Sequence, residues 1–521
     1  MKKKVLALIL TVCMVMGFAA CSKSADNLPE SSSGGNSSPG NSSSESKSPA
    51  ATGADEKGET STLVVSFRTN GNVPAESEIQ QVEEALNKIL REKINCEVKL
   101  MIIQSGSYPQ QMTLMLAGDE QLDVMGATFQ MLAPAVSSEQ LRDLDELLKE
   151  HGQGILSTLS PELLGCGIFN GAQYSIPIQA DSAVGMGFYV MRKDIADKYN
   201  IDVSSIKSYE DLTRVFELVH EKEPDLTILA PRNAGMSFLE YNCTWDKLGN
   251  QFGVLDNYGQ DDLKVVNLFE TQSYKNYLDA VREWYQKGFI SGDVTNATES
   301  GPSLMKAGNL FSYCGANKPG IYTQEKMATG YDVVGSQVLE SITWTGNAFQ
   351  WTIPENAKYP EKAMQFLNLM YTDPDVINTL VYGIEGEDYE VLEDGRVGYP
   401  EGIDATTVGY SLSSMLWAFG NEFNAYVWET NEADIWEQTI EWNKTGLRSK
   451  AYGFVFDSTP VANEMTAVQN VYNQYNMSLE CGVVDPAEVL DEMNEKLYAA
   501  GLQKVIDEKQ RQLDLWSSAK K

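Results

Sequence analysis

The chain has 521 residues and a formal net charge of −33 at pH 7, with 73 acidic and 40 basic side chains. So large an acidic excess argues against nucleic acids and anionic membrane surfaces as partners. The only two histidines, His151 and His220, argue against a multi-histidine metal site and a histidine-dependent catalytic triad.

The first residues have the three parts of an export signal. Three lysines precede the apolar segment 5–18, and two alanines separate this segment from Cys21. The apolar segment is too short to cross about 30 Å of hydrocarbon comfortably as a permanent helix. The pattern resembles a bacterial lipobox, although Phe18 stands where leucine is usual, and this implies cleavage before Cys21 and a lipid on that cysteine. Residues 1–20 are therefore predicted to be a signal peptide. A plain secretory signal and an uncleaved anchor are the alternatives.

Residues 21–61 are rich in serine, glycine, proline and asparagine and carry almost no aliphatic side chains. Such a segment cannot bury enough apolar surface to offset its ordering entropy, so it is predicted to be a flexible tether. No later segment approaches about 18 uninterrupted apolar residues. We therefore expect a protein held by its lipid at the extracellular face of a bacterial membrane.

From residue 62 the pattern changes to alternating strands and helices. Apolar runs at 63–67, 98–102 and 122–125 predict strands, and helical spacing between residues 79 and 90 and again from 106 to 118 predicts helices. This β-α-β-α-β order predicts an α/β fold with parallel-rich sheets that carry helices on both faces.

Later segments continue the helical pattern. Apolar stripes predict helices over 277–285 and 363–370, and Asp373 and Asp485, each followed by proline, have the form of helix N-caps. The last helix is predicted to reach about Trp516. The C-terminal part of the chain is therefore expected to be a helical extension.

Four stretches, taken in order, carry a resemblance to a known family. They are Gly171–Pro177 followed by Gly187–Asp194, Tyr199–Asp202 with Ser208–Leu212, Trp284–Asp293, and Tyr359–Leu367. Their order and spacing resemble the solute-binding proteins of ABC transporters, extracellular family 1, which are common as lipoproteins in Gram-positive bacteria.

The end of the chain resembles one subgroup of that family more closely. The matching stretches are Gly383–Gly386 with Tyr389, Gly453–Asp457, Gly482–Pro486, Ala500–Gly501, Val505 and Gln510–Asp514. The subgroup is labelled LipO-like and carries a C-terminal domain of unknown function, DUF3502. The resemblance covers nearly everything after residue 62.

This resemblance implies a two-lobe periplasmic-binding-protein-like fold of type II, with a hinge between the lobes. The chain would cross between lobes near Gln179, near Tyr331, and between Ile353 and Gly386. Lobe I would comprise 62–178 and about 332–385, and lobe II 179–331 and about 386–521, with the DUF3502-like region at about 386–521.

The resemblance also implies a function. The protein would be the membrane-anchored binding component of an ABC importer, a monomer without cofactor or metal. It would capture a small solute between two closing lobes, most plausibly an oligosaccharide, and deliver it to the permease subunits.

Candidate ligand residues follow first from the position of strand ends. Ligands of open parallel sheets bind beyond the carboxyl ends of strands. This rule indicates Arg68 and Asn70 after the first strand, Tyr108 after the second, and Phe129 after the third. Arg68 as an ordinary surface charge is the alternative.

Further candidates follow from the crossings and from sugar chemistry. Gln179 and Asp181 lie in the first crossing segment. Sugars are bound by flat aromatic faces and a few planar polar groups, which is the role expected for the tryptophans outside apolar stripes and for amides beside them. These residues are Trp245, Trp344, Trp417 and Asn421.

Two other classes of function remain open from the sequence. A cell-surface glycoside hydrolase needs two carboxylates about 5–10 Å apart, but no local signature marks such a pair. A solute sensor or adhesin that feeds no transporter is the other class. The acids of Asp256–Asp262 lack the order of an EF-hand calcium loop. The five cysteines after Cys21 show no C-x-x-C spacing and are expected to be small buried side chains.

Overall fold

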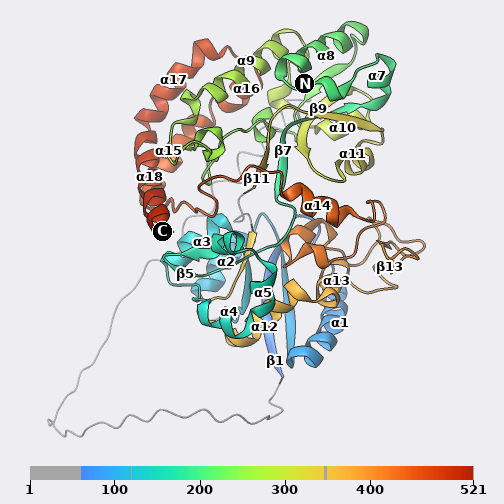
Figure 1. The fold of residues 1–521 in the computed structure, drawn as a ribbon, viewed down its shortest axis with the longest axis vertical. Helices are drawn as coiled ribbons and strands as arrows, with labels where there is room; N and C mark the ends of the chain where they lie inside the picture. Colours follow the sequence, from blue (N-terminus) through green and yellow to red (C-terminus); the bar gives the residue numbers. More distant parts are fainter. Residues whose placement is uncertain (1–59, 119, 345–348, 520–521) are drawn as a thin grey trace, which may run out of the picture. The chain divides into compact units, whose positions relative to one another are not determined.

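The computed structural model describes residues 60–118, 120–344 and 349–519 (Figure 1). The predicted signal peptide, Cys21 and nearly all of the predicted tether lie outside these described residues. Among the residues that are described, no helix is both long enough and apolar enough to cross a bilayer.

The first sheet contains the strands that the N-terminal pattern predicts. Its order is β2 (Cys96–Gln104), β1 (Ser61–Thr69), β3 (Val124–Thr128), β12 (Phe349–Thr352) and β6 (Ile176–Pro177). β1 pairs in parallel with β2 and β3, whereas β12 pairs antiparallel with β3 and β6. The alternating side chains of Leu63, Val65 and Phe67 are buried, as the period of a β-strand requires.

Helices of the same region follow the predicted stripes. In α1 (Glu76–Ile94), Ile79, Val82 and Leu86 are buried on one face. α13 (Pro374–Tyr382) begins at the predicted cap, where the Asp373 carboxylate accepts from the backbone N–H groups of Asp375 and Val376. The other helices of this part are α2 (Tyr108–Ala117), α3 (Phe129–Ser137), α4 (Asp145–His151), α5 (Gln153–Thr158), α6 (Pro161–Leu164) and α12 (Pro360–Thr372).

The second sheet is built around one long antiparallel strand. Its order is β10 (Val333–Gln337), β7 (Ala183–Arg192), β9 (Leu310–Asn317) and β8 (Thr227–Ala230), with β11 (Ser341–Thr343) also on β7. β8 and β9 are parallel, but β7 is antiparallel to β9, β10 and β11. The α/β fold class is confirmed, and the parallel-rich expectation fails here because β7 arrives from the other sheet and inserts between strands of the opposite direction.

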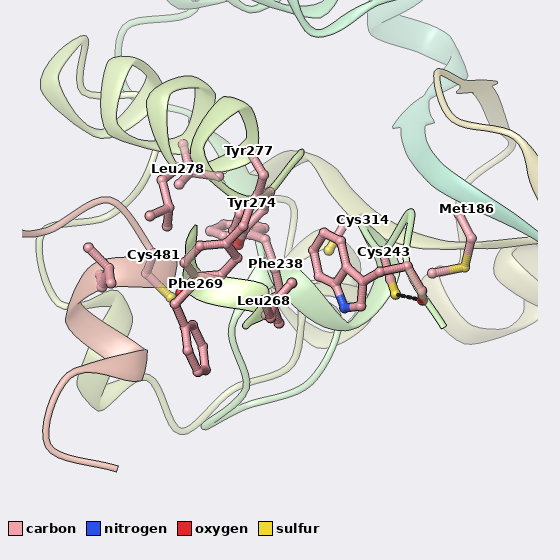
Figure 2. Close-up of a cluster of buried hydrophobic side chains, with 14 of the residues drawn as sticks. Met186, Phe238, Cys243, Leu268, Phe269, Tyr274, Tyr277, Leu278, Cys314 and Cys481 are labelled. Carbon is pink, nitrogen blue, oxygen red and sulfur yellow. Dashed lines mark hydrogen bonds between the residues drawn. The ribbon is translucent and has the colours of Figure 1, made fainter. Parts of the chain in front are cut away.

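The helices of the second sheet and of the C-terminal region form two apolar clusters, a large core and a smaller one that contains Met305 and Ile321. These helices are α7 (Lys193–Lys198), α8 (Tyr209–Lys222), α9 (Gln272–Gln286), α10 (Gly301–Lys306), α11 (Ile321–Thr329), α15 (Ala462–Tyr472), α16 (Asn476–Glu480), α17 (Pro486–Ala499) and α18 (Leu502–Ala519). Trp284 of α9 lies in the large core, as its apolar stripe predicts. Figure 2 shows Tyr274 and Tyr277 close to Cys481 from the C-terminal region. The five cysteines of the described residues are all buried, as expected.

The remaining ordered segments are short. They are the strand pairs β4 (Ile168–Phe169) with β5 (Ala172–Gln173) and β13 (Glu390–Val391) with β14 (Val397–Gly398), and helix α14 (Ile435–Asn443).

Sheet membership differs from the predicted lobe limits in two places. The prediction puts residues from 332 onward in lobe I, but β10 and β11 pair with β7, so the chain returns to the first sheet only after Thr343. It also puts residues after 385 in lobe II, but Tyr410, Leu412 and Met415 are buried in the core of the first sheet. A short apolar run predicts a strand but does not indicate which sheet the strand joins. The irregular segment 386–425 has no hydrophobic periodicity from which its place could be predicted.

Asp123 is a buried carboxylate that ties three segments of the first sheet together. Its Oδ2 accepts from the backbone N–H of Val64 at 2.9 Å, and its Oδ1 accepts from the backbone N–H groups of Lys358 at 2.7 Å and Tyr359 at 3.2 Å. An amide at this position would turn a donor toward at least one N–H group that now has an acceptor.

We predict that Asp123→Asn lowers the free energy of unfolding by about 2 kcal/mol, because a buried donor loses its acceptor. The exposed Asp225→Asn is the matched control and should leave stability unchanged. Urea denaturation measures both, and equal midpoints for Asp123→Asn and the parent would refute this role for the carboxylate.

Candidate functional site

The first crossing segment, residues 179–183, is held in place by residues from much later in the chain. The backbone N–H of Gln179 donates to the Gly420 carbonyl at 2.8 Å, and the N–H of Glu422 donates to the Gln179 carbonyl at 2.9 Å. Gln179 and Asn421 therefore lie side by side through their main chains. The Asn421 side chain accepts from the N–H of Phe423 at 3.3 Å, so part of its hydrogen-bonding capacity goes to the local turn.

Asn443, at the end of α14, holds the rest of this segment. Its Oδ1 accepts from the backbone N–H groups of Ser182 at 2.8 Å and Ala183 at 3.0 Å, and its Nδ2 donates to the Ala180 carbonyl at 3.0 Å. One side chain thus satisfies three main-chain groups of the crossing. Sequence reasoning missed Asn443, because no local pattern links it to a partner more than 250 residues earlier.

Three charged side chains meet at the same crossing. The Lys318 ammonium donates to Asp181 Oδ2 at 2.8 Å, and the Asp181 backbone N–H donates to Glu422 Oε1 at 2.8 Å. Glu422 is only 4% exposed. Burial, together with the nearby Asp181 carboxylate, raises the pKa of Glu422 to about 8.

A second cluster of polar and aromatic side chains lies where β1 ends. The Arg68 guanidinium donates to Asn70 Oδ1 at 3.3 Å and to Ser105 Oγ at 3.4 Å, and it lies 5.9 Å from the ring centroids of both Phe349 and Trp417. Burial lowers the pKa of Arg68. The structure thus brings Trp417, which was predicted from sugar chemistry, close to Arg68, which was predicted with Asn70 from the strand end.

Tyr108 was predicted as a ligand residue, but the structure places it in the core. It is fully buried, and its hydroxyl lies 3.1 Å from the Ser66 carbonyl and 2.7 Å from the Gly126 carbonyl within the first sheet. Tyr108 is the first residue of α2, and its side chain packs into a buried cluster instead of facing a solute beyond the strand end. Phe129 begins α3, and its side chain lies outside the described part of the structure.

A cavity of about 190 Å³ lies next to the first crossing segment. Four separate parts of the chain form its wall: Met186 of β7, residues between 240 and 258, β11 with Trp344, and residues 454–456. Two predicted residues, Trp245 and Trp344, are in this wall. The backbone N–H of Trp344 donates to the Ser182 carbonyl at 2.8 Å. Trp344 therefore lies beside the crossing segment, next to the neighbour of Asp181.

The two tryptophans differ in exposure. Trp344 is 44% exposed, so part of its ring is available to a solute. Trp245 is 1% exposed, and none of the described residues supplies a hydrogen-bond acceptor to its indole N–H. A buried donor without a partner is uncommon in proteins and is available to an incoming acceptor.

The wall also contains residues that sequence reasoning did not select. Tyr258, Phe454 and Phe456 contribute aromatic surface, and Glu240 and Lys247 contribute charge. Phe454 and Phe456 belong to Gly453–Asp457, a stretch that carried the family resemblance. No group of three or more histidine, cysteine, aspartate or glutamate side chains within the described ranges is arranged to hold a metal ion.

The sequence profile of the bacterial extracellular solute-binding proteins matches residues 76–377, more than half of the chain. The chain belongs to this family. A second profile, a domain of unknown function (DUF3502), matches residues 450–518, a shorter segment than the predicted 386–521.

Two curated relatives are similar over much of their length. A carbohydrate ABC transporter substrate-binding protein of Streptococcus pneumoniae serotype 4 is 28% identical over 446 residues, which cover 84% of this chain and 87% of the relative. Lipoprotein LipO of Bacillus subtilis is 22% identical over 333 residues, which cover 59% of this chain and 64% of the relative.

Among solved structures, the N-glycan transport solute-binding protein NgtS of Streptococcus pneumoniae has the same fold. Its TM-score is 0.76 at 25% identity, covering 88% of this chain and 100% of the relative. Complexes of NgtS with Man1GlcNAc and Man5GlcNAc match with TM-scores of 0.66 and 0.64. The predicted family, its type II two-lobe fold and its C-terminal DUF3502 domain are confirmed.

We predict that Glu422→Gln makes stability less sensitive to pH. The pKa of Glu422 is about 8 in the fold against 4.5 ordinarily, so the folded state binds this proton more tightly. The resulting stability is fully present below about pH 4.5 and is lost as the pH rises through about 8.

The variant should therefore gain stability relative to the parent between about pH 5.5 and about pH 8.5, by at least about 1.4 kcal/mol, the equivalent of one pKa unit. Urea denaturation at both pH values measures the difference. The exposed Glu437→Gln is the control, and parallel pH profiles for Glu422→Gln and the parent would contradict the raised pKa.

Proposed function

We propose that this protein is the solute-binding component of an ABC importer and that it binds an oligosaccharide at the cavity beside the first crossing segment. The observation that carries the proposal is the position of Trp344. Its partly exposed ring borders the cavity, and its main chain is hydrogen-bonded to the crossing segment.

The chemistry of the cavity suits a sugar. The partly exposed ring of Trp344 offers a flat face to the C–H surface of a sugar ring, and the buried rings of Trp245 and Tyr258 lie in the same wall. The Trp245 N–H can donate to a sugar oxygen, and the charged groups of Glu240 and Lys247 can bind hydroxyls. The predicted groups at Arg68 and Gln179 would extend the site along the crossing toward the first sheet.

The relatives support an oligosaccharide. NgtS is an N-glycan transport protein with complexes that contain mannose and N-acetylglucosamine, and the curated pneumococcal relative is a carbohydrate transport protein. The NgtS structure whose description names no ligand matches this chain with a TM-score of 0.76. The two NgtS complexes match it with TM-scores of 0.66 and 0.64. This spread supports two arrangements of the lobes, which a permease can distinguish. We infer binding and delivery to permease subunits by a monomer, without catalysis.

We predict that Trp344→Ala weakens oligosaccharide binding at least about tenfold, a loss of about 1.4 kcal/mol, because the variant removes a stacking face without disturbing the core. Calorimetric titration with mannose- and N-acetylglucosamine-containing oligosaccharides measures the effect. Tyr498→Ala is the control, since Tyr498 is 37% exposed and lies outside the cavity wall. Unchanged affinity for Trp344→Ala would remove this residue from the site.

We also propose that a lipid on Cys21 anchors the protein at the extracellular face of the membrane. The sequence before Cys21 supports this proposal, and so does the similarity to lipoprotein LipO. A tether after the lipid would let the binding body move over the membrane surface.

Cys21→Ala should move the protein from the detergent phase to the aqueous phase in a phase-separation experiment on whole cells, because the attachment sulfur is lost. Ser22→Ala is the control and should stay with the membrane. Equal partition of Cys21→Ala and the parent would contradict the lipid anchor.

A further inference from the structure

The DUF3502 region, residues 450–518, is built into the second lobe. Leu479, Leu497 and Leu513 belong to the same buried cluster as Trp284 of α9. Polar contacts add to this joint core, since the Arg282 guanidinium donates to the Gly482 carbonyl at 2.9 Å. The region therefore cannot move independently of the cavity that the second lobe carries.

This region also supplies part of the cavity wall directly. Phe454, Val455 and Phe456 line the cavity from the C-terminal side. Phe454 is fixed from behind by an edge-to-face contact with Trp516 of α18, with ring centroids 5.8 Å apart. Phe456 is only partly buried, so its ring is available to a solute.

Another part of the wall belongs to a strained loop, residues 247–253. Lys247, Leu248 and Gly249 of this loop line the cavity. Leu248 has a φ of 48°, a left-handed conformation that a bulky L-residue rarely adopts, and Gly249 follows with a φ of 100°. Such strain persists only where surrounding contacts enforce it, and it is frequent at functional sites.

One side chain of the DUF3502 region enforces this loop conformation. Lys509 of α18 is fully buried, and its ammonium lies 3.3 Å from the Lys247 carbonyl, 3.1 Å from both the carbonyl and Oδ1 of Asn250, and 2.7 Å from the Gly253 carbonyl. It also lies 5.1 Å from the ring centroid of Phe456. The same ammonium thus contacts both the strained loop and the aromatic wall.

Burying the charged ammonium of Lys509 costs free energy that an ordinary structural contact would not require. Burial lowers its pKa to about 7, although the nearby Asp246 carboxylate acts in the opposite direction. A methionine or leucine would fill the same space without burying a charge. The ring of carbonyl oxygens from one loop explains why an ammonium is present.

We propose that the DUF3502 region is the specificity element of the solute site: Phe454 and Phe456 contact the bound oligosaccharide, and Lys509 is a positioning residue that fixes the 247–253 loop against it. This inference rests on the proposed function and assigns a role to the region that the family profile leaves without one. It predicts that changes at Phe454, Phe456 or Lys509 alter which oligosaccharide binds best.

The test compares three variants of the full chain by calorimetric titration against a panel of mannose/N-acetylglucosamine, xylan and pectic oligosaccharides. Phe456→Ala removes the contact ring, and Lys509→Met removes the ammonium but keeps a long apolar side chain. Lys504→Met, on the same helix but exposed and paired with Glu464 at 3.0 Å, is the matched control. We expect Phe456→Ala and Lys509→Met to change the ratio of affinities for two oligosaccharides about tenfold or more, and Lys504→Met to keep the parent's ratios.

Each outcome supports or overturns the inference. If the parent binds oligosaccharides but Phe456→Ala and Lys509→Met keep its affinity ratios, this inference fails and the proposed function stands. If the parent binds no oligosaccharide of the panel, the proposed function fails and this inference fails with it. If Lys509→Met does not fold, Phe456→Ala decides, because its partly exposed side chain can be removed from a folded protein.

Discussion

The structure depends on how the backbone groups of residues 179–183 are hydrogen-bonded where the chain passes from the first sheet to the second. Peptide groups that leave one sheet before they join another need partners, because an unpaired buried N–H or carbonyl is costly. Here the partners are Gly420, Glu422 and Asn443, all more than 240 residues later. The crossing is thus fixed by residues 420–443, which come back to it from much later in the chain.

This constraint also decides which side chains lie along the crossing. The residues that hold the crossing bring Asp181, Lys318 and Glu422 together, and the N–H of Trp344 is held by the adjacent Ser182 carbonyl. A protein of net charge −33 therefore presents a balanced polar network and aromatic faces at this point. Such a surface suits a neutral polyhydroxylated solute better than a polyanion, since the overall field repels negative charge.

Local features were predictable from the sequence, and long-range ones were not. The stripe of α1 and the cap at Asp373 are encoded within a few residues, and both appear as predicted. β11 joins its sheet by pairing with β7, about 160 residues earlier. The hydrophobic pattern of a short strand does not indicate such a distant partner. Among the candidate residues, Arg68 and Trp417 lie together although the sequence did not indicate their contact, and Tyr108 is buried in the core.

The central claim is that an oligosaccharide binds beside the first crossing, against the wall that contains Trp344 and residues 454–456. Hydrogen–deuterium exchange of the full chain, with and without a saturating mannose/N-acetylglucosamine oligosaccharide, tests it most directly. The account predicts slower exchange in 179–185, in 244–249 and in 453–457 when the sugar is bound. Protection confined to other segments, with these three unchanged in the bound state, would contradict it.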